Sequence, residues 1–497
     1  MTDKTSPTQP KRAKDINEWA IETDVAVIGF GGAGACAALE AADAGADVQI
    51  FELASASGGS TALSSAEIYM GGNGGTRVQK ACGYDDSTEN MINFLKTAFG
   101  SNADEDKITS YAENSLAHFN WLVGMGVPFK DSELKERAIM ALTDDCLLFT
   151  GNEKAYPFTE AAYPVPRGHN LEVEGDNGGP LLMKILTEQV GKRDNIAVNY
   201  ETRALTLVID DSGSVVGLVV RMNQQEIAVK ARKGVVLCAG GFCMNEDMVR
   251  KYAPLFDKGM EPIGNPGDTG TGILMGQGVG AGTVNMQECF TTVPFYPPSS
   301  LTYGIFINDK GQRFINEDCY HGRVGYNALV QQQQHSKRVF LITDVDGYGD
   351  YEKMSYLGAQ VVGTGDSAEE LEKELGLVEG TLCHTLDTYN THAEKGEDPL
   401  FHKHEAWLRP LKAPYVALDC TLGHGAFYPF FTLGGLDSLP TGEVLTPERN
   451  VVPGLYAAGR TTAGIPRTAA GYASGMSVGD ATFFGRMAGK SAAGRSN

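Results

Sequence analysis

The stretch Asp24–Glu52, DVAVIGFGGAGACAALEAADAGADVQIFE, decides the fold class of this chain. Val25–Ile28 is a short β-branched run of the kind found in buried parallel strands. It leads into GFGGAG (29–34), a G-x-G-x-x-G pattern, then a helix of small residues and a second strand, DVQIF, which ends before Glu52. This order of strand, glycine turn, helix and strand predicts a dinucleotide-binding unit of the Rossmann type.

Each part of the pattern has its own physical task. Gly29 permits the tight turn, Gly31 lets a pyrophosphate approach the backbone, and Gly34 lets the helix pack on the strand. The free N–H groups at the helix start, around Ala33, favour phosphate. Glu52 can accept from ribose hydroxyls and disfavours a 2′-phosphate, so it favours FAD or NAD over NADP. The alternative is a glycine-rich turn that holds no ligand.

The composition limits the class of protein. The chain has 497 residues, 42% of them apolar, which is enough for a large core. Its formal net charge of -21 repels phosphate backbones, so we expect no nucleic-acid partner. The nine cysteines are scattered without metal-ligand spacing, so we expect a reduced protein and no metal site. No apolar run reaches the length of a membrane span, and the polar N-terminus resembles no secretory signal, so we expect a cytoplasmic location.

Four further stretches favour FAD over NAD. ASGGSTALSSAEIYMGG (56–72) offers small and hydroxyl residues for a pyrophosphate and a flavin edge. The stretch 204–233 predicts three strands joined by tight turns, a β-meander typical of two-dinucleotide-binding flavoproteins. GVVLCAGGFCMNEDM (234–248) predicts a buried strand followed by a helix capped by Asn245. NVVPGLYAAGRTTAGI (450–465) predicts another strand ending in glycine, at the same ligand-binding edge.

These stretches, in this order, resemble the fumarate reductase and 3-ketosteroid dehydrogenase superfamily of FAD enzymes, from about residue 24 to 489. NPGDTGTGILMGQGVGAG (265–282) resembles the family's T-G-D-G-x-x-M segment, and FTLGGLDSLPTGEVL (431–445) its T-x-G-G-L segment. The resemblance implies non-covalent FAD and a capping domain inserted into the FAD domain. We therefore predict an α/β fold with a Rossmann-type FAD domain (21–296 and 430–497), an inserted α+β capping domain (297–429) and a flexible tail (1–20).

The residues expected to contact FAD come from all of these segments. They are Gly29, Gly31, Ala33, Gly34, Glu52, Leu53, Gly59, Ser60, Thr61, Ala204, Ala239, Gly240, Asn245, Asp268, Gly459, Gly475, Ser477 and Val478.

The resemblance also distinguishes branches of the superfamily. Fumarate reductases carry histidines just before T-x-G-G and an arginine near the last glycine segment, which hold a dicarboxylate. This chain has Phe430 and Phe431 at the first place and Tyr472 at the second, which favours an apolar ketone. Arg460 and Arg467 lie nearby in sequence and keep an acid substrate open as an alternative.

Within the steroid branches, Δ1-dehydrogenases have a tyrosine with a glycine four residues later, but here that position is Met476. The Δ4-(5α)-dehydrogenases instead have a tyrosine and a serine two residues apart and a further tyrosine in N-E-D-x-Y. This chain has Tyr472 and Ser474, and Tyr320 in FINEDCYHGRVG (314–325). The sequence therefore resembles the Δ4-(5α) branch most.

That branch implies loss of a proton from C4 and of a hydride from C5 to flavin N5, which forms a C4–C5 double bond in a 3-oxo-5α-steroid. An external electron acceptor must then reoxidise the flavin. By resemblance, Tyr472 donates to the 3-oxygen as the enolate develops. Ser474 and Tyr320 act as a pair in proton removal, with the base itself left open.

Other interpretations of these residues and of the function stay open. Tyr472 could cap the last helix without chemistry, Tyr320 could be a core tyrosine, and His321 is an alternative acid or base. The aromatic side chains expected in the substrate pocket are Phe290, Phe295 and Phe430. The alternative functions are Δ1-dehydrogenation, an enone or fumarate-type reductase, and a flavin-binding protein without turnover.

Overall fold

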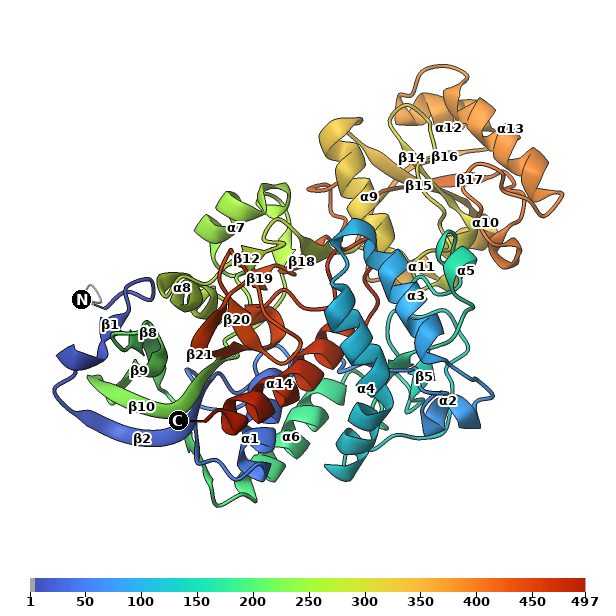
Figure 1. Cartoon of the computed structure of the whole chain (residues 1–497). Helices are drawn as coiled ribbons and strands as arrows, with labels where there is room; N and C mark the ends of the chain where they lie inside the picture. The colour runs from blue at the N-terminus through green and yellow to red at the C-terminus, as the bar shows by residue number, and fades with distance from the viewer. Residues whose placement is uncertain (1–4, 497) are drawn as a thin grey trace.

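The computed structural model of the chain describes residues 5–496 and has a mixed α/β fold (Figure 1). Its largest sheet has the strand order β1-β8-β9-β10-β2-β3-β7, and β21 pairs with both β10 and β20. The strands of this sheet are β1 (Lys11–Arg12), β2 (Trp19–Ile28), β3 (Val48–Phe51), β7 (Ile196–Asn199), β8 (Arg203–Ile209), β9 (Val215–Met222), β10 (Gln225–Leu237), β20 (Glu443–Leu445) and β21 (Val451–Ala457).

The parallel part of this sheet carries the predicted dinucleotide-binding unit. β2 pairs in parallel with β10 and β3, and β3 pairs in parallel with β7. α1 (Gly32–Asp43) connects β2 to β3 and packs against α14 (Met476–Gly494), as Figure 1 shows near the C-terminus. A Cβ atom at Gly485 or Gly489 would collide with backbone oxygens of α1, so these small residues let the two helices approach closely.

One long strand replaces two strands that the sequence predicts separately. We expect the meander to end at residue 233 and a new strand to begin at 234, but β10 runs without a break through both. Its first half pairs antiparallel with β9, and its last residues pair in parallel with β2 and β21. The register against β2 shifts between Ala231 and Gly234, a bulge that lets one strand serve both parts of the sheet.

The N-terminal segment differs from the predicted tail (1–20). Residues 1–4 lie outside the described part of the chain, but the rest takes part in the sheet. β1 pairs in parallel with β8, and β2 already begins at Trp19. Thr5 donates a hydrogen bond to the Glu226 carboxylate at 2.9 Å. The segment is therefore attached to the meander, because β8 offers it an open edge for backbone pairing.

A separate antiparallel sheet, upper right in Figure 1, lies within residues 305–419 and has the order β14-β15-β17-β16. Side chains such as Ile305, Phe340 and Leu371 form an apolar cluster of its own. The division of the chain at 297 and 429 stays a prediction. The elements of this region are β14 (Ile305–Asn308), α9 (His321–Gln334), β15 (Val339–Asp344), α10 (Val345–Tyr348), α11 (Tyr351–Met354), β16 (Val361–Gly365), α12 (Ala368–Leu375), α13 (Thr381–Ala393) and β17 (Tyr415–Asp419).

A third group of elements connects β3 to β7. Its short sheet has the order β4-β6-β5, and β4 also meets the segment before α14, since the Tyr69 N–H donates to the Gly475 carbonyl at 3.1 Å. The elements are β4 (Ile68–Tyr69), α2 (Arg77–Ala81), α3 (Thr88–Phe99), α4 (Glu105–Gly124), β5 (Leu147–Leu148), α5 (Phe158–Ala161), β6 (Gly168–His169) and α6 (Gly178–Gly191).

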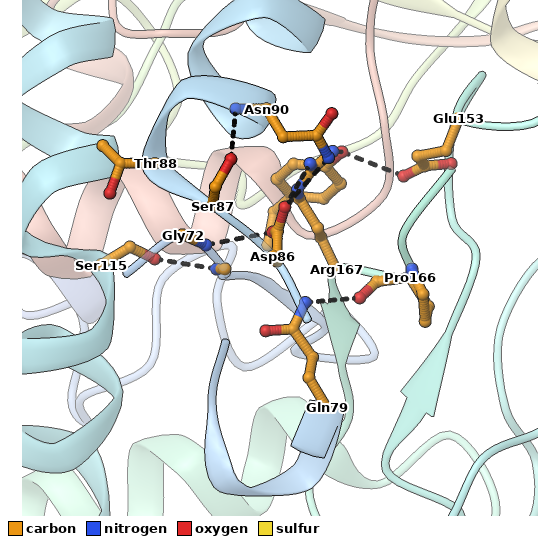
Figure 2. A network of polar contacts seen from close by, with 12 residues as sticks. Gly72, Gln79, Asp86, Ser87, Thr88, Asn90, Ser115, Glu153, Pro166 and Arg167 are labelled. Carbon is orange, nitrogen blue, oxygen red and sulfur yellow. Dashed lines mark hydrogen bonds and ion pairs between the residues drawn. The ribbon is translucent and has the colours of Figure 1, made fainter. Parts of the chain in front are cut away.

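A buried ion pair contacts the loop that follows β4. Both side chains of Arg167 and Asp86 are 0% exposed, and Figure 2 shows the guanidinium and the carboxylate joined. Two bonds connect them, Nε to Oδ2 at 2.7 Å and Nη2 to Oδ1 at 2.8 Å, and the Gly72 N–H adds a third to the carboxylate. Burial alone would raise the pKa of Asp86, but Arg167 holds it below its usual value. Removing one partner would leave a buried charge uncompensated, so this pair fixes the loop after β4.

The remaining short elements join the two larger sheets. They form the sheets β11-β18-β13 and β12-β19. None of the helices in residues 5–496 is long and apolar enough to cross a membrane. These elements are α7 (Glu246–Tyr252), β11 (Glu261–Pro262), α8 (Thr271–Gly278), β12 (Thr283–Val284), β13 (Cys289–Thr291), β18 (Pro429–Thr432) and β19 (Gly435–Leu436).

Candidate active site

A cavity of about 890 Å³ opens at the carboxyl ends of the parallel strands. Its wall contains the residues that directly follow β2, β3, β10 and β21, namely 29–33, 52–54, 238–240 and 458–460. In open α/β sheets, ligands bind in this crevice beyond the strand ends. The cavity continues toward the antiparallel sheet of residues 305–419, since Tyr320 and Tyr356 also line it.

The glycine-rich turn has the geometry of a phosphate cradle. Gly29 has φ +99°, and a Cβ there would collide with the Cys238 carbonyl. Gly31 also lines the cavity, but a Cβ there would meet no protein atom closer than 3.6 Å, so packing within the chain does not require this glycine. The open space at Gly31 fits a ligand that approaches the backbone at the start of α1.

Glu52 lies beside this turn. Its carboxylate accepts from the Phe30 N–H at 2.6 Å and from the Ala54 N–H at 2.8 Å, and the side chain lines the cavity. Each oxygen of a carboxylate can accept more than one hydrogen bond, so Glu52 is oriented by the backbone and can still accept from ribose hydroxyls.

The cavity wall also contains an ion pair. Arg460 pairs with Asp268, and both contact the Ser60 hydroxyl, at 2.6 Å and 2.9 Å. Arg467, the other arginine near the last glycine segment, pairs with Asp104 at 2.7 Å and does not line the cavity. Both guanidinium groups are therefore engaged by carboxylates within the protein.

The start of α14 forms another part of the wall. Gly475 caps this helix with φ +91°, and a Cβ there would lie 2.8 Å from the Tyr69 nitrogen. Ser477 and Val478 in the first turn line the cavity. The N-terminus of a helix of this length stabilises negative charge nearby. This property suits the predicted position of the first turn of α14 beside the flavin, which carries negative charge when it is reduced.

Most residues predicted to hold the cofactor line this cavity, and two do not. Gly34 packs directly against Gly29, since a Cβ at Gly34 would collide with the Gly29 carbonyl. This close contact is the role predicted for Gly34, which is to let the helix pack on the strand. Asn245 caps α7 by accepting from the Met248 N–H at 3.1 Å. The predicted cofactor residues that line the cavity are Gly29, Gly31, Ala33, Glu52, Leu53, Gly59, Ser60, Thr61, Ala204, Ala239, Gly240, Asp268, Gly459, Gly475, Ser477 and Val478.

The structure brings the three predicted catalytic side chains together. The Tyr320 hydroxyl and the Ser474 hydroxyl are 2.9 Å apart, and the ring centroids of Tyr320 and Tyr472 are 6.4 Å apart. All three residues line the cavity. The Tyr472 hydroxyl donates to the Ser477 hydroxyl at 2.9 Å, which places it between the start of α14 and the open space.

Backbone contacts hold this arrangement. Tyr320 is the N-cap residue of α9, and its N–H donates to the Asn152 side chain at 2.9 Å. The Ser474 N–H donates to the Thr150 carbonyl at 2.9 Å, and the Thr150 hydroxyl donates to the Ser474 carbonyl at 3.0 Å. Both side chains are therefore positioned by the segment that precedes α5.

Aromatic rings cover the wall beside Tyr472. Phe290 stacks on Phe431 with a centroid distance of 4.7 Å and contacts Tyr472 at 4.5 Å. Phe295 and Phe430 do not line the cavity, which corrects the predicted pocket. Phe430 packs on Phe256 in the core because successive residues of β18 face opposite sides, and Phe431 faces the cavity instead. Phe295 packs on Tyr296.

Burial keeps the hydroxyl groups of this site protonated. Burial raises the pKa of Tyr472 to about 12, with its contacts to Ser477 opposing the rise. Burial raises the pKa of Tyr320 well above its ordinary value. Both phenols are thus neutral hydrogen-bond donors at neutral pH. Neither is a proton acceptor by itself.

His321, the alternative acid or base, also lines the cavity. Its Nδ1 contacts the Thr292 hydroxyl, and its Nε2 is buried without a hydrogen-bond partner. Burial lowers its pKa to about 3, and the charge of Arg137 adds to this. The imidazole is therefore neutral and a weak base. Within residues 5–496, no group of three or more His, Cys, Asp or Glu side chains could hold a metal ion.

Glu67 lines the cavity but is not among the site residues predicted from the sequence. The Glu67 side chain is 5% exposed, and the Ser474 side chain opposes the rise that burial causes in the Glu67 pKa. It lies in the stretch 56–72 that the sequence assigns to the flavin edge. An acidic residue directly before a short apolar strand was the available signal.

Comparison with known proteins agrees with this geometry. The sequence profile of the FAD binding domain family matches residues 24–476. The chain belongs to the FAD binding domain family. Like its relatives in this family, it is an FAD-dependent oxidoreductase.

Relatives within the family differ in substrate. The structure of the 3-ketosteroid-Δ4-(5α)-dehydrogenase of Rhodococcus jostii RHA1, in complex with 4-androstene-3,17-dione, is 43% identical, covers 98% of this chain and 100% of that chain, and superimposes with a TM-score of 0.92. A 3-oxo-5-alpha-steroid 4-dehydrogenase of Comamonas testosteroni is 25% identical over 90% of this chain and 94% of its own. A probable fumarate reductase of Shewanella frigidimarina is 28% identical over 95% of this chain and 75% of its own.

Proposed function

We propose that this protein is a 3-ketosteroid dehydrogenase that introduces the C4–C5 double bond into 3-oxo-5α-steroids. One observation carries the proposal: the Tyr320 and Ser474 hydroxyls are 2.9 Å apart beside Tyr472, whose ring contacts Phe290 in the cavity wall. The resemblance to the Rhodococcus enzyme over nearly the whole chain supports the same substrate class.

The reaction requires a hydrogen-bond donor to the 3-oxygen and a group that receives the C4 proton. Removal of the C4 proton leaves negative charge on the 3-oxygen, and a donor aimed at that oxygen stabilises the transition state more than the ground state. Tyr472 is a neutral phenol with a raised pKa, so it can supply that donor. Tyr320 and Ser474 receive the C4 proton as a pair. FAD, when bound non-covalently in the cradle, accepts the two electrons of the oxidation.

The wall of the cavity argues against a dicarboxylate substrate. A fumarate-type reductase needs cationic side chains that face its substrate, but Arg467 pairs with Asp104 and does not line the cavity, and Arg460, which does line it, is paired with Asp268. Phe431 occupies the wall where that branch has a histidine. These observations favour a neutral ketone.

Δ1-dehydrogenation is the second candidate. The Δ1 pattern places a glycine where this chain has Met476, a buried residue that does not line the cavity. We further propose that residues 297–429 act as the cap over the substrate, since Tyr320 comes from that region and Ser474 from the other. An external electron acceptor completes the cycle.

Anaerobic mixing of the purified holoprotein with a 3-oxo-5α-steroid tests the proposal. We expect the flavin absorbance to bleach and a 4-ene-3-ketone to form. A 1-ene product would assign the protein to the Δ1 branch. Absence of bleaching with both 5α- and 5β-steroids, in a preparation that bleaches with dithionite, would remove it from the steroid class.

A further inference from the structure

The Tyr320–Ser474 pair lacks a proton acceptor of its own. Burial raises the pKa of the Tyr320 phenol, and a serine hydroxyl is a weaker base than a phenolate. A proton that enters this pair must therefore pass on to a third group. That group must lie next to one of the two hydroxyls and must not be occupied by other partners.

The carboxyl groups that line the cavity differ in this respect. Glu52 is occupied by two backbone N–H groups, and Asp268 by Arg460 and Ser60. Asp176 is exposed to solvent. Glu67 alone among the carboxyl groups of this wall is both buried, at 5% exposed, and left with an oxygen, Oε1, that has no hydrogen-bond partner in the described structure.

Glu67 is also held against Ser474. The backbone after Ser474 packs on the backbone after Glu67, where Tyr69 donates to the Gly475 carbonyl at 3.1 Å. Ala66, directly before Glu67, adopts a left-handed conformation with φ +51°, which is unusual for a residue with a side chain. Such local strain persists only where the surrounding structure imposes it, and Glu67, the next residue, lines the cavity.

We propose that Glu67 accepts the proton that leaves the Tyr320–Ser474 pair. This inference rests on the proposed steroid dehydrogenation. The C4–H bond breaks and its electron pair forms the enolate, whose oxygen accepts a hydrogen bond from Tyr472. The proton enters at Tyr320 or Ser474, and the proton that Ser474 releases forms a new O–H bond on Glu67. The C5–H bond then breaks with its electron pair as a hydride, for which bound FAD would be the acceptor, and the enolate electrons form the C4–C5 double bond as the 3-oxo group is restored.

The charges around Glu67 adapt it to this task. Burial raises its pKa to about 8, the hydrogen bond from Ser474 opposes the rise, and the charges of Asp176 and Glu153 add to it. Burial raises the pKa of Tyr320 and of Tyr472, and the charge of Glu67 adds to both rises, so the two phenols are neutral. Glu153 is itself occupied, by the Tyr69 hydroxyl at 3.0 Å and the Gly151 N–H at 2.9 Å.

Only ionised Glu67 can accept a proton, so the reaction should speed up as pH rises through the pKa of Glu67.

The test measures single-turnover flavin bleaching by a 3-oxo-5α-steroid from pH 6 to pH 10. For the unmodified holoprotein we expect the rate to rise about tenfold per pH unit and to level off above about pH 8. Glu67→Gln keeps the shape but cannot accept a proton, so it should lose the rise and be about 100-fold slower or more at high pH. Glu67→Asp should restore the rise in part.

Two further measurements exclude a merely structural role. Asp176→Asn removes a like charge outside the relay, so the rise in rate should move to lower pH. Infrared difference spectra of the unmodified protein minus Glu67→Gln should show the C=O band of a protonated carboxyl at pH 6 that disappears at pH 10. An unmoved rise in Asp176→Asn, or no titrating band, would overturn the assignment.

The outcomes separate the two proposals. If the unmodified protein forms the 4-ene and Glu67→Gln forms it at the same rate with the same pH dependence, Glu67 is not the acceptor and the proposed function stands. If the unmodified protein forms no 4-ene, the proposed function fails and the relay fails with it, whatever the infrared titration of Glu67 shows.

Discussion

The hydroxyl of Tyr320 lies 2.9 Å from the hydroxyl of Ser474, although 154 positions separate the two residues in the chain. Tyr320 is the N-cap residue of α9, in the region that carries the antiparallel sheet, and Ser474 lies in the segment that precedes α14. The proposed proton-transfer pair is therefore formed only where these two regions meet. The predictions below test this pair, the donor beside it, the aromatic wall and the FAD cradle.

Tyr472→Phe should lower turnover about 100-fold or more, because one preorganised donor to a developing oxyanion contributes about 3–4 kcal/mol to transition-state stabilisation. The measurement is steady-state formation of the 4-ene product. Tyr428→Phe is the matched control, because this buried phenol donates to the Cys420 carbonyl at 2.6 Å and does not line the cavity. Equal rates for the two variants would leave Tyr472 as a packing residue.

Tyr320→Phe and Ser474→Ala should each slow flavin bleaching about 100-fold or more, because either change interrupts the hydroxyl pair. The double variant should be little slower than the slower single variant, since residues that act as a unit are not additive. Stopped-flow absorbance of the three variants measures this. Effects that add fully would show that the two hydroxyls act independently.

Phe431→Ala should raise the KM for the steroid about tenfold, because this ring lines the cavity beside the proposed catalytic side chains. Phe430→Ala, its neighbour, should instead destabilise the protein by about 3–5 kcal/mol and leave the KM nearly unchanged, because that ring packs on Phe256 in the core. Steady-state kinetics and thermal unfolding measure the two effects. The reverse assignment would mean that β18 presents its other face to the cavity.

Gly31→Ala should weaken FAD binding about tenfold or more and leave the fold intact, since a methyl group there meets no protein atom closer than 3.6 Å but enters the cradle. Gly29→Ala should destabilise the protein itself, because its φ of +99° is strained for alanine and the methyl group would collide with the Cys238 carbonyl. Flavin fluorescence reports affinity, and thermal unfolding of the apoproteins reports the fold. Unchanged FAD affinity in Gly31→Ala would place the pyrophosphate elsewhere.

Local patterns predicted the dinucleotide-binding unit. The turn from Gly29 to Gly34, the helix after it and the acidic Glu52 interact with one another over about one supersecondary unit, so their order alone identifies it. The strand boundaries were less predictable. β10 continues through the point where the sequence suggests a break, because its first half pairs with the preceding strand β9 and its last residues pair with β21, which lies far away in the chain.

The sequence by itself determined the nucleotide-binding class, the resemblance to FAD enzymes and the identity of Tyr472, Ser474 and Tyr320 as candidates, because glycine turns and short motifs carry their physical meaning locally. Only the tertiary structure decided that Phe431 rather than Phe430 faces the cavity. The two residues are adjacent phenylalanines in β18, so the sequence does not indicate which of them points to the core. Only the tertiary structure brought Glu67 next to Ser474, because the backbones after these residues pack together only in the folded chain.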